Sequence, residues 1–166
     1  MTLNCKNNFP IFQNQPGLVY LDNASTTQMP QTVIDAVTEY YSQYKANVHR
    51  AVYKLGEEAE KRYEEARAIV AEFLHAVPEE IVFTNGTTDG LNGLAFSLGR
   101  NLRAGDNVVL TRMEHHANLI PWQQMSQSYG FELRFIELNG YELNLEQAKK
   151  IIAKHPKIVS FVHISN

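Results

Sequence analysis

Residues 80–118 constrain the fold more than any other part of the chain, because they combine two strand patterns with a glycine turn and a helix start. An apolar run at 81–84 predicts a strand that leads into a polar turn at 85–88, after which a helix is expected to open at Asp89. A second apolar run at 108–111 predicts the neighbouring strand. A strand that leads through a short turn into a helix indicates an α/β protein.

The turn at 85–88 has the composition of a phosphate-binding site. Gly86 allows a tight backbone turn, and Thr87 and Thr88 place hydroxyl groups where the helix begins. The unpaired N–H groups of a first helical turn attract anions, because a helix N-terminus carries roughly half a positive charge. An N-cap turn that binds nothing has the same composition, so both interpretations stay open on these residues alone.

Two adjacent histidines, His115 and His116, follow the second strand, at the sheet edge where open α/β proteins hold ligands. One of them could stack on a cofactor ring, and a solvated or core pair is the plainer alternative. A metal site with Glu114 and His49 is disfavoured, because adjacent side chains point to different sides and the helical His-x-x-x-His spacing is absent. We therefore expect no metal, and a ligand that is both phosphorylated and planar.

The rest of the chain alternates helix and strand patterns. Further strands are expected at 18–21, 131–137 and 157–164, and further helices at about 30–44, 57–75, 119–129 and 144–154. From residue 80 onward the order is strand–helix repeated three times plus a strand, which predicts a parallel sheet with helical crossovers. The last strand lacks the covering helix that a buried parallel strand normally has, so the sequence is expected to be cut from a longer one.

This order predicts a division of the chain into three parts. We expect an extended lead-in at 1–17, a helical segment at 18–78 and a partial cofactor-binding α/β domain at 79–166.

The composition restricts the partners and the compartment. A formal net charge of -3, with 44% apolar and 20% charged residues, is ordinary for a soluble globular protein and gives no basic stripe for nucleic acid. No apolar run approaches the roughly 18 residues of a membrane span, and the first residues lack an apolar signal core. We therefore expect a cytoplasmic protein that binds neither membrane nor nucleic acid. Cys5 is the only cysteine, which excludes an intrachain disulfide.

Five segments, taken in order and spacing, match one known family. They are Tyr-Leu-Asp-Asn-Ala-Ser-Thr-Thr at 20–27, Ala-Asn-Val-His-Arg at 46–50, Ile-Val-Phe-Thr-Asn-Gly-Thr-Thr-Asp-Gly-Leu-Asn at 81–92, Ala-Gly-Asp at 104–106 with Met-Glu-His-His-Ala-Asn-Leu-Ile-Pro-Trp at 113–122, and His-Ile-Ser-Asn at 163–166. The chain resembles the N-terminal part of the class V aminotransferases, most closely the cysteine desulfurases that also act as selenocysteine lyases. The resemblance implies the fold type I architecture of pyridoxal-phosphate-dependent transferases, with the large domain incomplete at its C-terminal end.

The resemblance assigns cofactor contacts position by position. Gly86, Thr87 and Thr88 match the turn that holds the phosphate of pyridoxal 5'-phosphate. His115 matches the imidazole that stacks on the pyridine ring and relays protons. Asn166 matches an asparagine near the phenolic oxygen of the cofactor and the substrate carboxylate.

It also assigns positions around the substrate. His49 matches a position at the mouth of the active site and near the dimer interface, with Ala24 and Ser25 close by. We therefore expect Ala24, Ser25 and Asn166 to contact substrate. Asp89 departs from the family pattern, where glutamate is usual, and we expect this change to leave the backbone cradle intact.

The activity that the resemblance implies is conversion of L-cysteine, or L-selenocysteine, to L-alanine, with a persulfide left on a loop cysteine. The Glu-His-His-Ala-Asn-x-x-Pro-Trp form at 114–122 resembles the branch that passes sulfur to an acceptor protein in iron–sulfur cluster assembly. The full-length enzyme would be a homodimer. The Schiff-base lysine, the aspartate that pairs with the pyridinium nitrogen, the acceptor cysteine and the substrate-clamping arginine of the family lie beyond Asn166, so we expect this chain alone to be inactive.

Two alternatives remain beside a desulfurase fragment. One is a sister enzyme of the same fold, such as an epimerase or a kynureninase-like lyase, which would lack the acceptor cysteine. The other is a non-catalytic binding or assembly module that keeps the sheet for a partner and binds no pyridoxal phosphate.

Overall fold

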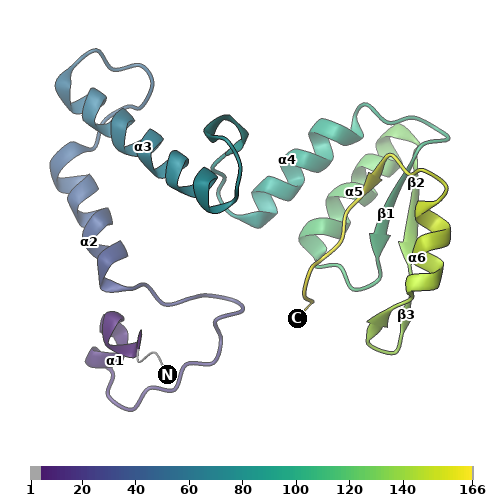
Figure 1. Cartoon of the computed structure of the whole chain (residues 1–166), viewed down its shortest axis with the longest axis horizontal. Helices are drawn as coiled ribbons and strands as arrows, with labels where there is room; N and C mark the ends of the chain where they lie inside the picture. Colours follow the sequence, from purple (N-terminus) through teal and green to yellow (C-terminus); the bar gives the residue numbers. More distant parts are fainter. Residues whose placement is uncertain (1–4, 166) are drawn as a thin grey trace. The chain divides into compact units, whose positions relative to one another are not determined.

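The computed structural model describes residues 5–165 and divides the chain into two compact units, one ending at Val82 and one beginning at Phe83. Figure 1 shows helices in the first unit and a parallel sheet between helices in the second. Asn166 lies outside the described residues.

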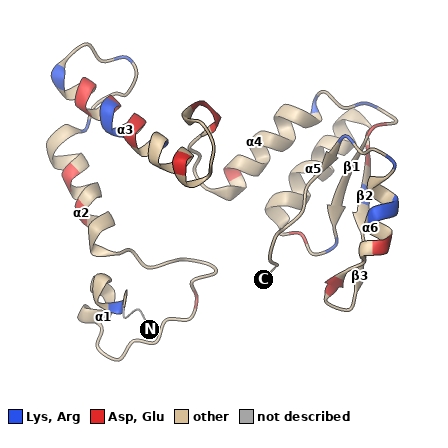
Figure 2. Cartoon of the chain, in the orientation of Figure 1, with Lys and Arg blue, Asp and Glu red and all other residues tan. Residues whose placement is uncertain are grey.

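Within its described residues the first unit is built from helical elements. They are the short helices η1 (Cys5–Asn8), α1 (Pro10–Asn14) and η3 (Pro78–Glu80), the helix α2 (Gln31–Glu39), the π-helix η2 (Tyr40–Tyr44) and the long helix α3 (Lys54–Phe73). The helix expected at about 30–44 is therefore α2, which widens into one π-helical turn. Figure 2 shows acidic and basic residues interspersed along α3, as expected for a helix with a solvated face.

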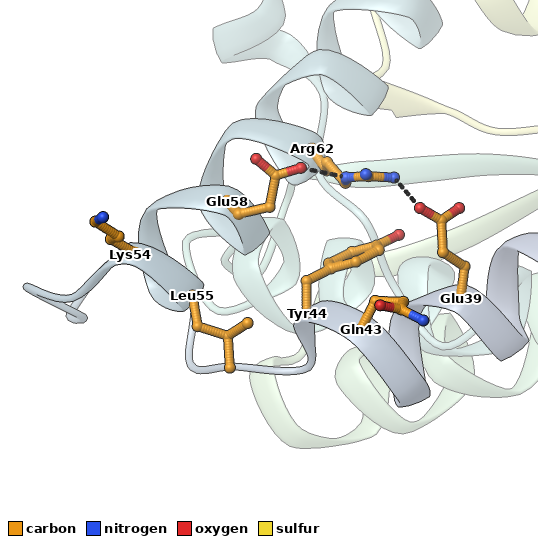
Figure 3. A pocket seen from close by; sticks show the side chains of 7 residues that line it. All are labelled: Glu39, Gln43, Tyr44, Lys54, Leu55, Glu58 and Arg62. Carbon is orange, nitrogen blue, oxygen red and sulfur yellow. Dashed lines mark hydrogen bonds and ion pairs between the residues drawn. The ribbon is translucent and has the colours of Figure 1, made fainter.

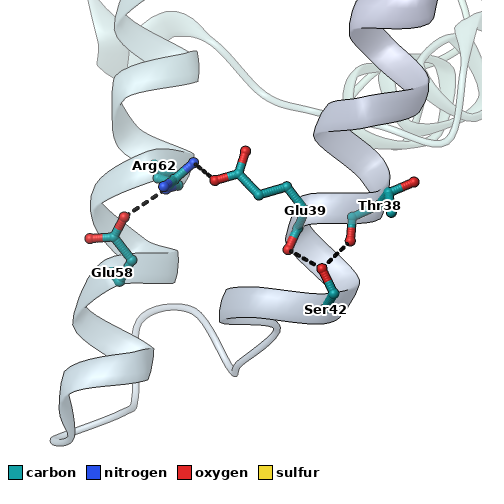
Figure 4. Close-up of polar contacts among 5 residues, drawn as sticks. All are labelled: Thr38, Glu39, Ser42, Glu58 and Arg62. Carbon is teal, nitrogen blue, oxygen red and sulfur yellow. Dashed lines mark hydrogen bonds and ion pairs between the residues drawn. The ribbon is translucent and has the colours of Figure 1, made fainter.

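Arg62 of α3 fastens the π-helical turn to the long helix (Figure 4). Its guanidinium lies 3.0 Å from the carboxylate of Glu39, donates to Glu58 at 2.6 Å, and stacks 4.2 Å from the ring centre of Tyr44. The hydroxyl of Ser42 donates to the carbonyl of Thr38 at 2.7 Å, a bond that accompanies bends in helices. One arginine thus contacts the end of α2, the π-helical turn and its own helix.

The strand expected at 18–21 is wrong. These residues form no ladder with another described segment, and Val19 and Leu21 are exposed. The hydroxyl of Tyr20 instead donates to the carbonyl of Thr26, which folds the segment onto its own turn at 22–26. Apolar residues alone do not make a strand, because a strand also needs a backbone partner.

The long helix also leaves large apolar side chains uncovered. Ala59 is buried, but Ile69 is 67% exposed and Phe73 is 82% exposed. Within this unit the elements that pack most closely on α3 are short: η2 near its beginning and η3 near its end. A helix face of this length needs a longer partner to be buried.

The second unit is a parallel sheet with helices on both faces. Its elements are α4 (Thr87–Gly99), β1 (Asn107–Thr111), α5 (His116–Tyr129), β2 (Glu132–Ile136), β3 (Leu138–Asn139), β4 (Glu142–Leu143), α6 (Leu145–Ile152) and β5 (Ile158–Val159). The sheet has the order β2-β1-β5, and both pairings are parallel. The predicted α/β class with a parallel sheet is confirmed.

The central strand β1 is buried on both faces, and its side chains alternate between two clusters. Val108 and Leu110 pack with residues of α4 and α5, including Trp122 and Met125. Val109 points the other way, to Ile136 and to Ala148 of α6. The two clusters hold α4 and α5 on one face of the sheet and α6 on the other.

The prediction of a strand at 81–84 is wrong, and the helices α4 and α5 begin earlier than predicted. Ile81 has extended backbone angles, but residues 81–84 are not part of either sheet of the described chain. The helix α4 begins at Thr87 rather than at Asp89. The helix α5 begins at His116 rather than at residue 119, which leaves Pro121 inside it and buried.

The final strand is shorter than the expected 157–164. The backbone N–H of Ser160 still donates to Val109 at 3.0 Å, but the next inward N–H, that of Val162, donates at 3.0 Å to the side chain of Glu114. A carboxylate thus replaces the backbone acceptor, and the ladder ends. The short β3–β4 hairpin was not expected from the sequence.

Candidate functional site

The turn before α4 is built for glycine. Gly86 is the N-cap of α4 with φ 105° and ψ 175°, a region that is essentially closed to other residues. The hydroxyl of Thr84 donates to the carbonyl of Gly86 at 3.1 Å, and the carboxylate of Asp89 accepts from the backbone N–H of Asn85 at 3.0 Å. These two bonds fix the turn on both sides of the glycine.

This geometry leaves donors for an anion. Gly86 has no side chain to cap α4, so among the described residues no side-chain cap engages the first helical turn, which includes Thr87 and Thr88. A Cβ built on Gly86 meets nothing within 4 Å, so the space beside the turn is open. Exposed amides, a hydroxyl on each threonine and the positive end of a helix fit a phosphate group.

A cavity of about 320 Å³ lies between the first turns of α4 and the histidine segment at 115–116. Residues of α4 and α5, together with the N-cap of α5, line it: Thr88, Asn92, His115, His116, Ala117, Ile120, Pro121 and Gln124. Thr88 and His115, two of the residues expected at the cofactor, therefore share one cavity. Its volume is that of a small-molecule site.

His115 is itself the N-cap of α5. Its backbone is extended (φ -63°, ψ 147°), and its Nδ1 accepts from the backbone N–H of Ala117 at 3.1 Å. The ring of His116 lies 6.3 Å away, measured between ring centres. The side chain of His115 is exposed and so is available to a ligand in the cavity.

The expected residues of the first unit have partners there. Ser25 donates to the carboxylate of Asp22, and the hydroxyl and main chain of this turn are exposed, as is Ala24. His49 has a left-handed backbone (φ 71°), and its Nδ1 lies 3.5 Å from the carboxylate of Glu60. Asn166 falls outside the described residues.

Sequence reasoning missed the polar network under the histidine segment. Glu114 entered only as a metal-ligand candidate and Asn118 only as a motif letter, yet the amide of Asn118 donates to Glu114 at 2.8 Å. Both residues precede the helix expected at 119–129, so helical spacing did not indicate this bond. The bond from Val162 to Glu114 spans 48 residues and had no local signal.

Two larger hollows lie in the first unit. One, of about 610 Å³, runs between α2, η2 and α3, and the other, of about 500 Å³, surrounds the ion-paired Arg62 (Figure 3). In the second, the Arg62 hydrogen bond holds the pKa of Glu58 below its ordinary value of 4.5. Neither of these hollows is lined by a residue of the first turn of α4 or by His115, whereas the smaller cavity of the second unit is lined by Thr88 and His115.

The second unit is thus an α/β fold in which Thr88 of α4 and His115, which follows the carboxyl end of β1, line one cavity. Residues 19–166 match the family model described as aminotransferase class-V. The chain belongs to the aminotransferase class V family.

The relatives that it matches are named cysteine desulfurases. It is 46% identical to one from Haloferax volcanii over 90% of this chain, and 44% identical to one from Synechococcus elongatus over 97% of it. The apo structure of a cysteine desulfurase from Thermococcus onnurineus NA1 superposes with a TM-score of 0.90 at 42% identity, over 97% of this chain. The chain spans 36%, 27% and 40% of these three relatives.

Proposed function

We propose that this chain carries the cofactor cradle of a pyridoxal-phosphate-dependent cysteine desulfurase. The cavity that Thr88 and His115 share, in a chain 42–46% identical to three named cysteine desulfurases, is the observation that carries the proposal. When bound, the cofactor would act as an electron sink for the carbanion chemistry of an amino acid substrate. L-cysteine is the proposed substrate and L-alanine the proposed product.

The residues present have distinct tasks in this proposal. The backbone N–H groups of Thr87 and Thr88, with their hydroxyls, would bind the phosphate at the start of α4. His115 would cover one face of the heterocycle and hold a proton on its ring. Asn166, Ala24, Ser25 and His49 stay proposed contacts for substrate and for the mouth of the site.

We also propose that the 166-residue chain is inactive by itself. No lysine is among the described residues that line the cavity, and the proposed chemistry needs a lysine amine to hold the cofactor aldehyde. We expect no borohydride-trapped adduct at a single lysine and no alanine from L-cysteine. A saturable adduct at one lysine would show that a lysine of this chain serves the site, and would contradict this part.

The remaining parts of the proposal concern partners and place. They are a homodimer of the longer enzyme, an acceptor protein that takes the persulfide sulfur into iron–sulfur cluster assembly, and a cytoplasmic location. Within residues 5–165, none of the helices has the length and apolar character to span a bilayer.

Phosphate binding is the direct test of the cradle. We would titrate the chain with pyridoxamine 5'-phosphate, which lacks the aldehyde and so cannot react with surface lysines, and with pyridoxamine as the phosphate-free reference. Gly86→Ala should weaken binding of the phosphate ester by about tenfold or more, because alanine strains the turn that aims the amides. Calorimetry would measure both affinities.

Gly140→Ala is the matched control. Gly140 also has a positive φ (66°), but it lies in the β3–β4 hairpin, so its replacement should leave the affinity unchanged. Equal binding of pyridoxamine and its phosphate ester would rule out a phosphate cradle. No binding of either by a folded chain would favour the non-catalytic assembly module.

A further inference from the structure

The segment that carries His115 is held by a network of hydrogen bonds, and Glu114 determines which groups in it donate and which accept. The carboxylate of Glu114 accepts three hydrogen bonds: from the hydroxyl of Thr111, from the backbone N–H of Val162 at 3.0 Å and from the side-chain amide of Asn118 at 2.8 Å. An ionised carboxylate only accepts. Three donors therefore suit glutamate, whose two carboxylate oxygens both accept, and not glutamine, whose NH₂ group donates.

Glu114 in turn fixes the orientation of Asn118, which is buried. Because the NH₂ group of Asn118 donates to Glu114, its oxygen faces the other way. That oxygen accepts from the hydroxyl of Ser160 at 2.9 Å and from the indole N–H of Trp122 at 3.3 Å. The network thus ties the end of β1, the first turn of α5 and the segment after β5 together.

His115 lies inside the loop that the bond between Glu114 and Asn118 closes. The bond joins the residue before the N-cap to the third residue of α5. The carbonyl of His115 accepts from the backbone N–H of Asn118 at 2.9 Å, and its Nδ1 accepts from that of Ala117 at 3.1 Å. A ring nitrogen that accepts a hydrogen bond carries no proton, so the proton of the neutral ring is on Nε2.

We propose that Glu114 and Asn118 are positioning residues that hold the imidazole of His115 in its Nε2–H tautomer. With Nδ1 committed to the backbone, Nε2 is the ring atom left to hold and move a proton in the cavity. The catalytic meaning of this tautomer rests on the proposed function. The tautomer and its dependence on Glu114 are properties of the chain without cofactor.

The tautomer can be read directly by ¹⁵N NMR of the labelled full chain, without cofactor, at about pH 8.5, well above the ordinary imidazole pKa of about 6.5. The loss of signals in His115→Gln identifies the ring among the six histidines. In the unsubstituted chain we expect Nε2 protonated and Nδ1 unprotonated. A ring that averages between tautomers, or carries its proton on Nδ1, would overturn the proposal.

Glu114→Gln tests the positioning role, because its amide turns a donor toward one of the three donors. We expect the tautomer ratio of His115 to fall about fivefold to tenfold, the loss that corresponds to one hydrogen bond. Thr111→Val removes a single donor and should give a smaller fall in the same direction. Glu137→Gln is the control, because this exposed carboxylate pairs with Arg112 outside the network.

A purely structural role for Glu114 would lower the melting temperature and leave the tautomer ratio unchanged. An unchanged ratio in folded Glu114→Gln, or in Thr111→Val if Glu114→Gln does not fold, therefore refutes the positioning role. Adding pyridoxamine 5'-phosphate to the same samples separates the two proposals. An ordered tautomer in a chain that binds no phosphate ester would leave this inference standing and remove the proposed function.

Discussion

Histidine occupies backbone positions in this chain where glycine is the usual residue. His49, His75 and His155 have φ values of 71°, 54° and 51°. At His75 the cause is a helix end. The N–H of His75 donates to the carbonyl of Glu72, and the N–H of Ala76 donates to the carbonyl of Ala71. This pair of hydrogen bonds is typical of a helix that ends with a left-handed residue. Histidine tolerates this region better than most residues, but it retains the steric cost of its Cβ.

His75→Gly should therefore stabilise the chain by about 1 kcal/mol, because glycine adopts the left-handed conformation without that cost. Urea unfolding followed by circular dichroism measures the change. Glu72→Gly, three residues earlier within α3, should destabilise by about 1 kcal/mol instead. If both variants lose stability equally, the left-handed cap does not limit the stability of α3.

The sequence predicts elements whose causes are local and misses features that depend on distant residues. The long helix, α4, α5, β1 and β2 follow from periodicity, and so does the parallel order of the sheet. Residues 18–21 and 81–84 have strand composition but belong to neither sheet of the described chain, because composition does not determine which segments pair. For the site, the glycine turn and His115 could be predicted from local residues, whereas one of the three donors to Glu114, the backbone N–H of Val162, comes from 48 residues away.

At the level of elements, the π-helical turn η2 should depend on Arg62. Arg62→Met keeps the long aliphatic stem but removes both ion pairs and the stacking on Tyr44. We expect faster amide hydrogen exchange in η2 and little change in the second half of α3. Lys61→Met, which removes a neighbouring exposed charge, should leave the exchange in η2 unchanged.

The effect of Arg62→Met should also depend on pH. The Arg62 hydrogen bond lowers the pKa of Glu58 from 4.5, so the stabilisation is complete above that value and is lost as the pH falls through the lowered pKa of the folded chain. The difference in melting temperature between the two chains should therefore narrow from pH 7 toward acid. A difference that stays constant would show that stacking on Tyr44, rather than the ion pair, holds the turn.

Considered whole, the chain exposes much apolar surface that its described elements do not cover. Along the outer side of α3, Ile69 is 67% exposed and Phe73 is 82% exposed, and Leu74 beyond the helix end is 58% exposed. Contiguous apolar patches of this kind mark surfaces that bind other protein. The relatives that share the fold are about two and a half times as long or more, since the chain spans 27–40% of them.

The isolated chain should consequently self-associate in a concentration-dependent way, as measured by sedimentation velocity. Phe73→Ser should weaken the association, because it removes the most exposed ring of this α3 patch. Tyr141→Ser is the comparison: Tyr141 is 99% exposed but belongs to the β3–β4 turn of the second unit and not to α3. A monodisperse monomer at all concentrations would show that the α3 patch does not mediate self-association.

The ladder between β1 and β5 stops where Glu114 receives the N–H of Val162. The length of the Glu114 side chain therefore sets the distance between the backbone after β1 and the backbone after β5. A shorter acid, as in Glu114→Asp, would have to draw the backbones together or release one of them. The separation of these two segments at the carboxyl end of the sheet thus depends on the length of one side chain.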